Sequence, residues 1–239
     1  MNLFYHPEIG TMTVIEFEDS ESQHISRVLR KTTGDEIDLT DGKGIHARAI
    51  LTVSKKNVRA EIIASKIVER RKQFLELAIA PTKSNERIEW FVEKAVEIGI
   101  EKITLLQCKN SERNFLKTDR LIKVAVSAMK QSLQFYLPEI IEPVRFQDWV
   151  EQQKDGMRCI AHCHSDLKKS LLQKVISGED HVVIAIGPEG DFDLTEVELA
   201  KAAGFKGVSL GESRLRTETA ALAAVHTFEL VNQLVQKTS

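Results

Sequence analysis

The chain has 239 residues, of which 42% are hydrophobic and 28% are charged, and this composition is typical of a soluble globular protein. Its formal net charge of −2 argues against a protein that binds nucleic acid over its whole surface through many phosphate contacts. No apolar run approaches the length needed to cross a bilayer, so we expect a cytoplasmic protein without a membrane anchor.

Basic side chains are concentrated in one part of the amino-terminal region. Residues 1–23 carry five acidic side chains and no Lys or Arg, whereas residues 24–72 carry twelve basic and six acidic side chains. This imbalance predicts a locally positive face on the first part of the chain. Charge alone favours a simpler interpretation, in which this face is solvated and has no partner.

Residues 1–72 are predicted to form a small β-barrel that contains one helix. The predicted strands are short alternating runs, separated by turns, at residues 13–17, 36–40, 45–53 and 58–63. The helix is predicted at residues 21–31 and carries His24, Arg27 and Arg30 at a spacing of three. This spacing places the three side chains on one face of a regular helix.

Residues 73–239 are predicted to form an α/β domain, because a charged stretch at 66–72 leads into a continuous apolar strand. The predicted strands are at residues 74–80, 103–106, 158–161, 182–186 and 207–210. The predicted helices are at residues 87–98, 121–133, 171–176 and 222–235, with a connecting helix after residues 144–149. Continuous apolar strands of this kind are typical of a parallel sheet that is buried on both faces.

Cysteine usage predicts a reducing compartment and no disulfide framework. The chain has three cysteines, Cys108, Cys159 and Cys163, which is a small and odd number. Residues 159–164 read Cys-Ile-Ala-His-Cys-His and contain four possible metal ligands. A closed zinc site normally draws its ligands from two separated pairs, and the sequence has no second pair, so we expect no metal site.

Two of the predicted strands end in loops that a packed core would not need. Strand 182–186 leads into Gly-Pro-Glu-Gly at 187–190, and strand 207–210 leads into Gly-Glu-Ser-Arg-Leu-Arg-Thr-Glu-Thr-Ala at 211–220. Between them, Asp193 and Glu196 have the spacing of a capping box, so a helix is expected to begin there. A strand, helix and strand in this order bring both loops to one edge of a parallel sheet, where α/β proteins bind ligands.

The sequences of these loops resemble those of the RsmE-type methyltransferases, a family of the SPOUT superfamily. These enzymes modify N3 of a uridine in small-subunit ribosomal RNA. The resemblance rests on Gly-Pro-Glu-Gly-x-Phe at 187–192, Leu-Gly at 210–211 and Leu-Arg-Thr-Glu-Thr-Ala at 215–220. Further matches, at residues 22–35, 93–99, 111–113 with Arg120, and 131–132, extend it over nearly the full chain. The chain departs from the commonest family form at Lys130 and Gln134, where relatives have Glu and Arg.

The resemblance implies a fold, a cofactor and partners. The fold is an amino-terminal PUA-like β-barrel that binds RNA, followed by a SPOUT α/β domain with a trefoil knot and a mainly parallel sheet. The cofactor is S-adenosylmethionine, and the substrate is a uridine of 16S ribosomal RNA, methylated at N3 in the small ribosomal subunit. The family also forms homodimers, with the cofactor pocket near the interface. A knot is not expected from periodicity or spacing, because knots are rare.

The resemblance and the loop chemistry together define candidate site residues. The candidate cofactor-binding residues are His162, Ile186, Gly187, Pro188, Glu189, Gly190, Leu210, Gly211, Leu215, Arg216, Thr217, Thr219 and Ala220. The candidate RNA-binding residues are His24, Arg27, Arg30, Lys83, Arg113, Arg120, Lys130, Gln131 and Arg214. The candidate catalytic residues are Arg216, Glu189 and Glu218.

The catalytic roles follow from the weak nucleophilicity of the uracil imide nitrogen. A cation beside a ring carbonyl stabilises the charge that develops when N3 loses its proton, and Arg216 is our choice because it lies in a loop. Glu189 and Glu218 compete as proton acceptors. Glu218 has a simpler explanation as an acidic residue in the first turn of the last helix, where the helix dipole favours it.

Two alternatives of a different class stay open. The turn at residues 187–190 precedes a helix start, so it is also compatible with a phosphate bound at a helix amino terminus. However, the chain has neither the dinucleotide fingerprint nor the Lys-Ser/Thr pair of a phosphate loop. A non-catalytic RNA-binding module explains the amino-terminal barrel and leaves the two later loops unexplained.

Overall fold

The computed structural model describes residues 2–54, 57–112 and 116–236, and the chain separates into two compact units. The first unit contains the chain up to Arg70 together with Met129–Leu137. The second unit contains Arg71–Ala128 and the chain from Pro138 onward. No sequence pattern indicated that residues 129–137 pack with the first unit.

The first unit is built on a curled, mixed five-stranded sheet with the strand order β1-β3-β4-β5-β2. Its strands are β1 (Leu3–Tyr5), β2 (Val14–Glu16), β3 (Glu36–Thr40), β4 (Ile45–Val53) and β5 (Val58–Ile67). β1 pairs with β3 in parallel, and the other neighbours are antiparallel. The four predicted strands are therefore confirmed. β1 was not predicted, because three residues are too few to show the alternation of apolar and polar residues that is typical of a strand.

The predicted helix at residues 21–31 is wrong in length and in type. An α-helix, α1 (Asp19–Gln23), is followed by a π-helical turn, η1 (His24–Val28), in which the Leu29 amide donates to the His24 carbonyl at 2.9 Å. Arg30 then takes a left-handed conformation with φ of 53°, which ends the helical segment. The wider π turn removes the three-residue periodicity that was expected to align His24, Arg27 and Arg30.

The segment Met129–Leu137 packs closely within the first unit. The Gly44 amide donates to the Phe135 carbonyl at 3.0 Å, and the Tyr136 hydroxyl donates to the Val68 carbonyl at 2.8 Å. Gly44 has φ of 108°, and a Cβ at this position would overlap the Tyr136 ring. Glycine is therefore required here for both its conformation and its size.

The second unit is built on a seven-stranded parallel sheet with the order β10-β12-β9-β11-β6-β7-β8. Its strands are β6 (Phe74–Ile79), β7 (Lys102–Gln107), β8 (Glu139–Arg145), β9 (Met157–Ala161), β10 (Ser170–Leu171), β11 (His181–Ile186) and β12 (Lys206–Ser209). Its helices are α2 (Asn85–Ile98), α3 (Thr118–Gln131), α4 (Phe146–Gln152), α5 (Leu172–Val175), α6 (Leu194–Ala202) and α7 (Thr217–Gln236), and the last three residues of α3 belong to the first unit. The α/β class and the parallel sheet agree with the prediction, and β8 and β10 are additional strands.

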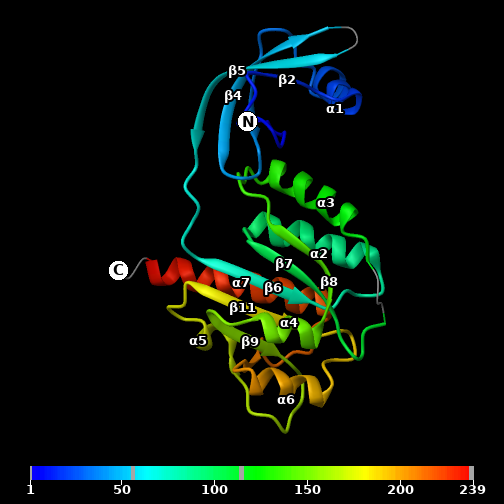
Figure 1. Ribbon diagram of the computed structural model, residues 1–239, viewed down its shortest axis with the longest axis vertical. Helices are drawn as coiled ribbons and strands as arrows, with labels where there is room; N and C mark the ends of the chain where they lie inside the picture. The colour runs from blue at the N-terminus through cyan, green and yellow to red at the C-terminus, as the bar shows by residue number, and fades with distance from the viewer. Residues whose placement is uncertain (1, 55–56, 113–115, 237–239) are drawn as a thin grey trace. The chain divides into compact units, whose positions relative to one another are not determined.

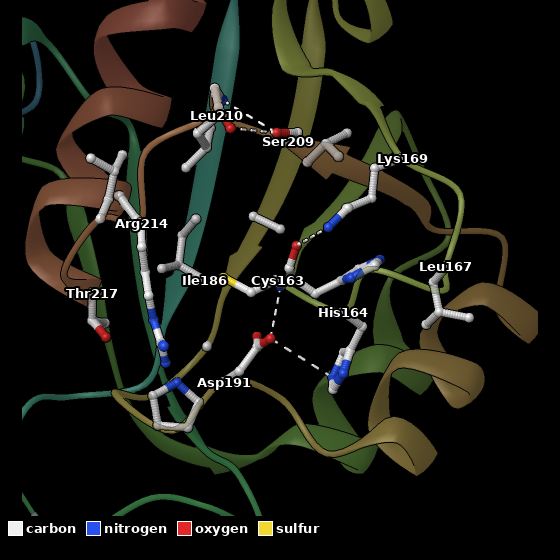
Figure 2. A pocket seen from close by; sticks show the side chains of 18 of the residues that line it. Cys163, His164, Leu167, Lys169, Ile186, Asp191, Ser209, Leu210, Arg214 and Thr217 are labelled. Atoms are coloured by element: carbon white, nitrogen blue, oxygen red, sulfur yellow. Dashed lines mark hydrogen bonds and ion pairs between the residues drawn. The ribbon is translucent and has the colours of Figure 1, made fainter.

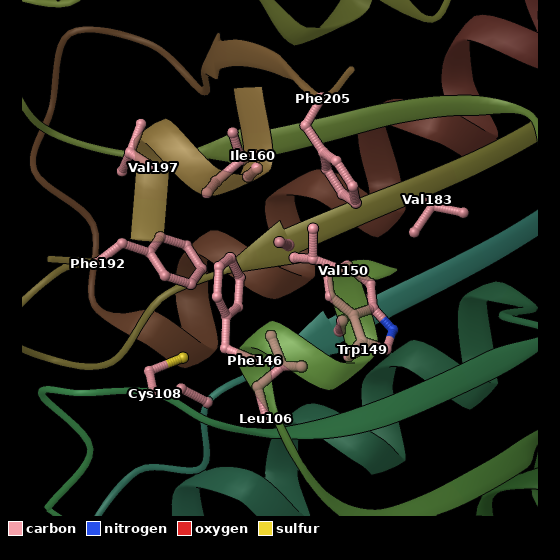
Figure 3. Close-up of a cluster of buried hydrophobic side chains, with 14 residues drawn as sticks. Leu106, Cys108, Phe146, Trp149, Val150, Ile160, Val183, Phe192, Val197 and Phe205 are labelled. Atoms are coloured by element: carbon pink, nitrogen blue, oxygen red, sulfur yellow. The ribbon is translucent and has the colours of Figure 1, made fainter. Parts of the chain in front are cut away.

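Helices cover both faces of this sheet. α7 contacts β6, β11 and α2, and Figure 1 shows it lying along β6. On the opposite face, α4 and α6 enclose a cluster of buried side chains in which the Phe146 and Phe192 rings lie 5.1 Å apart (Figure 3). Val183 of β11 points into this cluster, and strand alternation turns its neighbours toward the α7 face. The sheet is thus buried on both sides, which explains its continuous apolar strands.

A buried carboxylate lies within this core. Glu76 of β6 is 4% exposed, and its Oε1 accepts hydrogen bonds from the Thr104 hydroxyl at 2.7 Å and from the Trp149 indole at 2.8 Å. Its Oε2 lies 3.2 Å from the Lys102 ammonium. A buried charge is tolerated only when its hydrogen bonds are made, so these contacts fix β6, β7 and α4 relative to one another.

None of the helices in the described part of the chain is long and apolar enough to cross a membrane. The trefoil knot that the resemblance implies stays a prediction.

Replacing Thr104 with Val should lower the free energy of unfolding by about 2 kcal/mol, because it removes a donor to a buried carboxylate without changing the side-chain volume much. Thr104→Ser keeps the hydroxyl and loses one methyl group, so it should cost about 1 kcal/mol. Urea unfolding of the three proteins measures both changes. A Val variant that is as stable as the Ser variant would contradict this role for the hydroxyl.

Candidate functional site

The carboxyl ends of three neighbouring strands meet at one edge of the parallel sheet. β9 lies between β12 and β11, and these strands end at Ala161, Ser209 and Ile186. The loops that follow them therefore converge. This is also where the sheet order reverses, since β6, β7 and β8 extend in one direction and β11, β9 and β12 in the other. Such a switch point is the usual position of ligands in α/β proteins.

A large cavity of about 1290 Å³ opens at this edge, and Gly187 and Gly211 both line it. The sequence-predicted residues that line the cavity are His162, Ile186, Gly187, Pro188, Glu189, Leu210, Gly211, Arg214, Leu215, Arg216, Thr217 and Ala220. Gly190, Glu218 and Thr219 do not line it, although Glu218 and Thr219 line a smaller hollow. Figure 2 shows Ile186, Arg214 and Thr217 on one side of the cavity, with His164, Leu167 and Lys169 on the other.

Sequence reasoning missed one wall of the cavity. The loop after β9 contributes Cys163, His164, Ser165, Asp166, Leu167 and Lys169. His162 was already predicted at the end of β9. Because ligands bind beyond the carboxyl ends of parallel strands, the loop after His162 could have been included in the predicted site. Arg87 of α2 also lines the cavity, and no local pattern marks it.

Asp191 joins the first loop to the loop after β9. Its Oδ2 accepts from the Cys163 amide at 2.7 Å, and its Oδ1 accepts from the Phe192 amide at 2.9 Å. Asp191 has φ of 67°, and its amide closes the turn by donating to the Pro188 carbonyl at 2.9 Å. A Cβ on Gly187 would lie 2.9 Å from the Phe192 ring, so only glycine fits at the start of this turn.

The helix that follows this turn begins as the sequence predicts. The Asp193 carboxylate accepts from the Thr195 amide at 3.0 Å, and the Glu196 carboxylate accepts from the Asp193 amide at 2.9 Å, which completes the capping box. The Lys109 ammonium lies 2.9 Å from the same Asp193 carboxylate. Hydrogen bonds from the Thr195 hydroxyl at 2.6 Å, from Lys109 and from the Thr195 amide hold the pKa of Asp193 below its usual value. The loop at residues 187–193 is therefore anchored at its carboxyl end.

His162 is a buried histidine in the wall of the cavity. It is 5% exposed, and neither ring nitrogen has a hydrogen-bond partner within the described residues. Burial, reinforced by the positive charge of Lys169, lowers the pKa of His162 to about 4. A Cβ on Gly207 would lie 3.0 Å from His162 Nε2, so glycine makes room for the ring. The wall of the cavity thus contains a neutral imidazole whose two ring nitrogens are buried and lack partners among the described residues.

The two candidate proton acceptors share one cation. The Arg87 guanidinium lies 3.1 Å from a Glu189 carboxylate oxygen and 3.7 Å from Glu218 Oε1. Glu189 is exposed, whereas Glu218 is only 6% exposed and its Oε2 has no partner within the described residues. The Arg216 guanidinium makes no hydrogen bond or ion pair with the part of the chain that the structure describes, so it is free to meet a ligand.

The candidate RNA-binding residues are dispersed over both units. In the first unit His24, Arg27, Arg30 and Gln131 are exposed, and the Lys130 ammonium lies 3.0 Å from the Glu21 carboxylate. In the second unit Lys83 lies 3.6 Å from Glu112, and Arg120 lies 2.6 Å from Glu89. Arg214 lines the large cavity, and Arg113 lies outside the described residues.

Two family models match the chain. The model described as an RNA methyltransferase domain matches residues 69–229, and the model described as an RNA methyltransferase PUA domain matches residues 17–63. The second match agrees with the predicted PUA-like fold of the curled amino-terminal sheet.

Individual relatives agree with these matches. The chain is 32% identical over 159 residues to the ribosomal RNA small subunit methyltransferase E of Mesomycoplasma hyopneumoniae. The aligned region covers 64% of this chain and 67% of that protein. It is 38% identical to a probable rRNA methyltransferase from Porphyromonas gingivalis, whose structure matches 97% of this chain and 100% of that chain with a TM-score of 0.88. It is 26% identical to ribosomal RNA small subunit methyltransferase E from Neisseria gonorrhoeae bound to S-adenosyl methionine, with a TM-score of 0.82 and coverage of 97% and 98%.

The lowered pKa of His162 predicts a pH dependence of stability. His162 takes up a proton near pH 6.5 in the unfolded chain and only near pH 4 in the folded protein. The free energy of unfolding therefore decreases as the pH falls from 6.5 to 4. Between pH 7 and pH 5 the loss should be about 2 kcal/mol. His162→Gln cannot take up the proton and should lose correspondingly less stability, as measured by urea unfolding at both pH values. If the wild type and His162→Gln lost equal stability between pH 7 and pH 5, the protonation of His162 would not be the cause.

Proposed function

The chain belongs to the RNA methyltransferase family, and on that premise we propose that it transfers a methyl group from S-adenosylmethionine to N3 of a uridine in 16S ribosomal RNA. The observation that carries this proposal is the convergence of the loops after β11 and β12 on one cavity. A nucleotide bound at the start of α6 would use the first loop alone, and an RNA-binding module would use neither loop.

The residues of the large cavity suit S-adenosylmethionine. The cavity exceeds the roughly 300 to 1,000 Å³ that is typical of small-molecule sites, so it has room for the cofactor and an approaching substrate. Ile186, Leu210 and Leu215 supply apolar surface for an adenine ring. The neutral ring of His162 places no positive charge beside a sulfonium group.

The reaction needs an electrophile, a proton acceptor and a means of stabilising charge on the uracil. S-adenosylmethionine supplies a methyl group on a positively charged sulfur, and the carbon–sulfur bond breaks as uracil N3 attacks, with its electron pair remaining on the sulfur. A carboxylate takes the N3 proton, and Glu189 and Glu218 are the candidates. The Arg216 guanidinium balances the negative charge that develops on a ring carbonyl oxygen. The two loops supply the alignment of these groups.

We propose that the substrate RNA is held by cationic and polar side chains on both units. His24, Arg27 and Arg30 in the first unit are exposed and carry the charge that phosphate contacts require. Lys83, Arg113, Arg120, Lys130, Gln131 and Arg214 complete the proposed set. The ion pair of Lys130 with Glu21 must open if Lys130 is to contact RNA.

Three further features belong to this proposal. The protein acts in the cytoplasm on RNA of the small ribosomal subunit. It forms a homodimer with the cofactor cavity near the interface. The exposed leucines Leu230 and Leu234, one turn apart on α7, provide an apolar stripe that a second copy of the chain can cover.

Calorimetry with S-adenosylmethionine and mass mapping of methylated uridine test the proposed function. Purified protein should release or absorb heat on titration with the cofactor. Ribosomal RNA from cells that lack the protein should lose methylation at one uridine. The absence of both effects would count against the function and favour the RNA-binding alternative.

Arg216→Ala should lower the methylation rate by about 100-fold or more, because it removes the cation that stabilises charge on the uracil. The affinity for S-adenosylmethionine should change by less than about threefold. Arg214→Ala is the matched control, since Arg214 is also an exposed arginine of the same loop, and it should weaken RNA binding with a smaller effect on the rate at saturation. Equal loss of rate and cofactor affinity in Arg216→Ala would assign Arg216 to cofactor binding instead.

A further inference from the structure

A second, smaller hollow lies beside the large cavity. It has a volume of about 280 Å³ and is lined by Glu86, Arg87, Trp90, Arg216, Glu218 and Thr219, from α2, the start of α7 and the loop before it. Arg87 and Arg216 line both spaces, so the hollow and the cavity are neighbours that share a boundary. A group held in the hollow therefore lies next to the space proposed for the methyl donor.

Trp90 gives the hollow an aromatic wall that the core of the protein does not use. It is 41% exposed, whereas its neighbours Phe91 and Val92 on α2 are fully buried. The other tryptophan, Trp149, is buried and donates its indole N–H to Glu76. An exposed indole at the edge of a ligand cavity offers a flat surface on which a nucleobase can stack.

Glu218 gives the hollow an acceptor that lacks a donor. The residue is 6% exposed, and its Oε2 has no hydrogen-bond partner within the described residues, while Oε1 faces Arg87 at 3.7 Å. A buried carboxylate oxygen without a donor is unfavourable, so a ligand that donates a hydrogen bond here gains affinity. Glu189 differs, because it is exposed and lies 3.1 Å from Arg87.

We propose that this hollow receives the pyrimidine ring of the target nucleotide and selects uracil. Trp90 stacks on the ring, Glu218 Oε2 accepts the N3–H, and Arg216 donates to a ring carbonyl oxygen. The inference rests on the proposed function and goes beyond it, because it adds Trp90 to the site and chooses Glu218 over Glu189 as the proton acceptor. The N3 proton passes to Glu218 first. The electron pair that it leaves on N3 then forms the bond to the methyl carbon as the carbon–sulfur bond breaks.

The same groups discriminate against cytosine. Uracil presents an N3–H donor between two carbonyl acceptors, which matches a carboxylate acceptor beside an arginine donor. Cytosine presents an acceptor at N3, which opposes the Glu218 carboxylate, and it has an amino donor in place of the O4 acceptor, so it leaves only O2 to accept from an arginine. Sites that pair buried polar groups with a base in this way reject the mismatched base strongly, because those groups are left unpaired.

Trp90→Ala should raise the KM for unmethylated small-subunit RNA by about tenfold, because stacking on an aromatic side chain contributes that much to the binding of a base. Trp90→Phe keeps an aromatic ring and should recover most of the affinity. In the wild type, this RNA should quench the fluorescence of Trp90, and the quenching should be lost in Trp90→Phe, where only the buried Trp149 remains. Cofactor binding should be unchanged in both variants.

Glu218→Gln should lower kcat by about 100-fold or more with little change in KM, since glutamine keeps the shape of the side chain and cannot take the proton. Its rate should recover as the pH approaches the pKa of free uridine, where N3 ionises without a base. Glu189→Gln tests the competing acceptor and should lower kcat less than Glu218→Gln does. Glu151→Gln is the control, because Glu151 is exposed on α4 and lines neither space, and it should keep the wild-type rate.

The outcomes separate this inference from the proposed function. A wild-type protein that neither binds S-adenosylmethionine nor methylates the RNA overturns the proposed function. An active wild type with unchanged KM in Trp90→Ala, or without fluorescence quenching, overturns the base-binding role of Trp90. A Trp90→Ala protein that changes oligomeric state in analytical ultracentrifugation assigns Trp90 to a subunit interface and also overturns it. A Glu218→Gln rate that does not recover at high pH overturns the role of Glu218 as proton acceptor.

Discussion

The hydrogen-bonded register of β9 between β11 and β12 is the constraint on which the site depends. Ala161 of β9 pairs with Ile186 of β11 on one side and with Val208 of β12 on the other, so the three strands end within one residue of the same level. His162, Gly187 and Leu210 each follow directly after the end of their strand. Because a shift of one residue would turn every side chain of a strand to the other face, the packed clusters on both faces also fix the position of the loops.

Much of the second unit follows from its sequence, because buried parallel strands are continuous apolar runs with glycines or polar loops after them. β6, β7 and β11 are of this kind, whereas β9 and β12 are shorter and only partly buried. The capping box at Asp193 was also predicted. β8 was missed because it is an edge strand whose residues are partly exposed and include Pro143, so it lacks the apolar pattern. The π turn at His24–Val28 was missed because packing, and not local propensity, decides whether the backbone hydrogen bonds join residues four apart, as in an α-helix, or five apart, as in a π-helix.

The site was predictable only where its residues follow strands. Gly187, Leu210 and Leu215 occupy such positions and line the cavity, and His162 follows the strand between them. Arg87 lies more than a hundred residues before Glu189 in the chain, and its approach to that carboxylate depends on how α2 packs against α7. Sequence patterns report on the periodicity of one element and contain little information about which side chains meet across elements. Trp90 was overlooked for the same reason.

The position of Arg87 between two carboxylates makes the two acids electrostatically interdependent. While both are ionised, one guanidinium divides its attraction between the loop carboxylate Glu189 and the helix carboxylate Glu218. When Glu218 gains a proton it loses its negative charge, and the Arg87 guanidinium then attracts Glu189 alone. The ion pair that joins the loop at residues 187–190 to α2 is therefore stronger while Glu218 holds the proton that it takes in the proposed reaction.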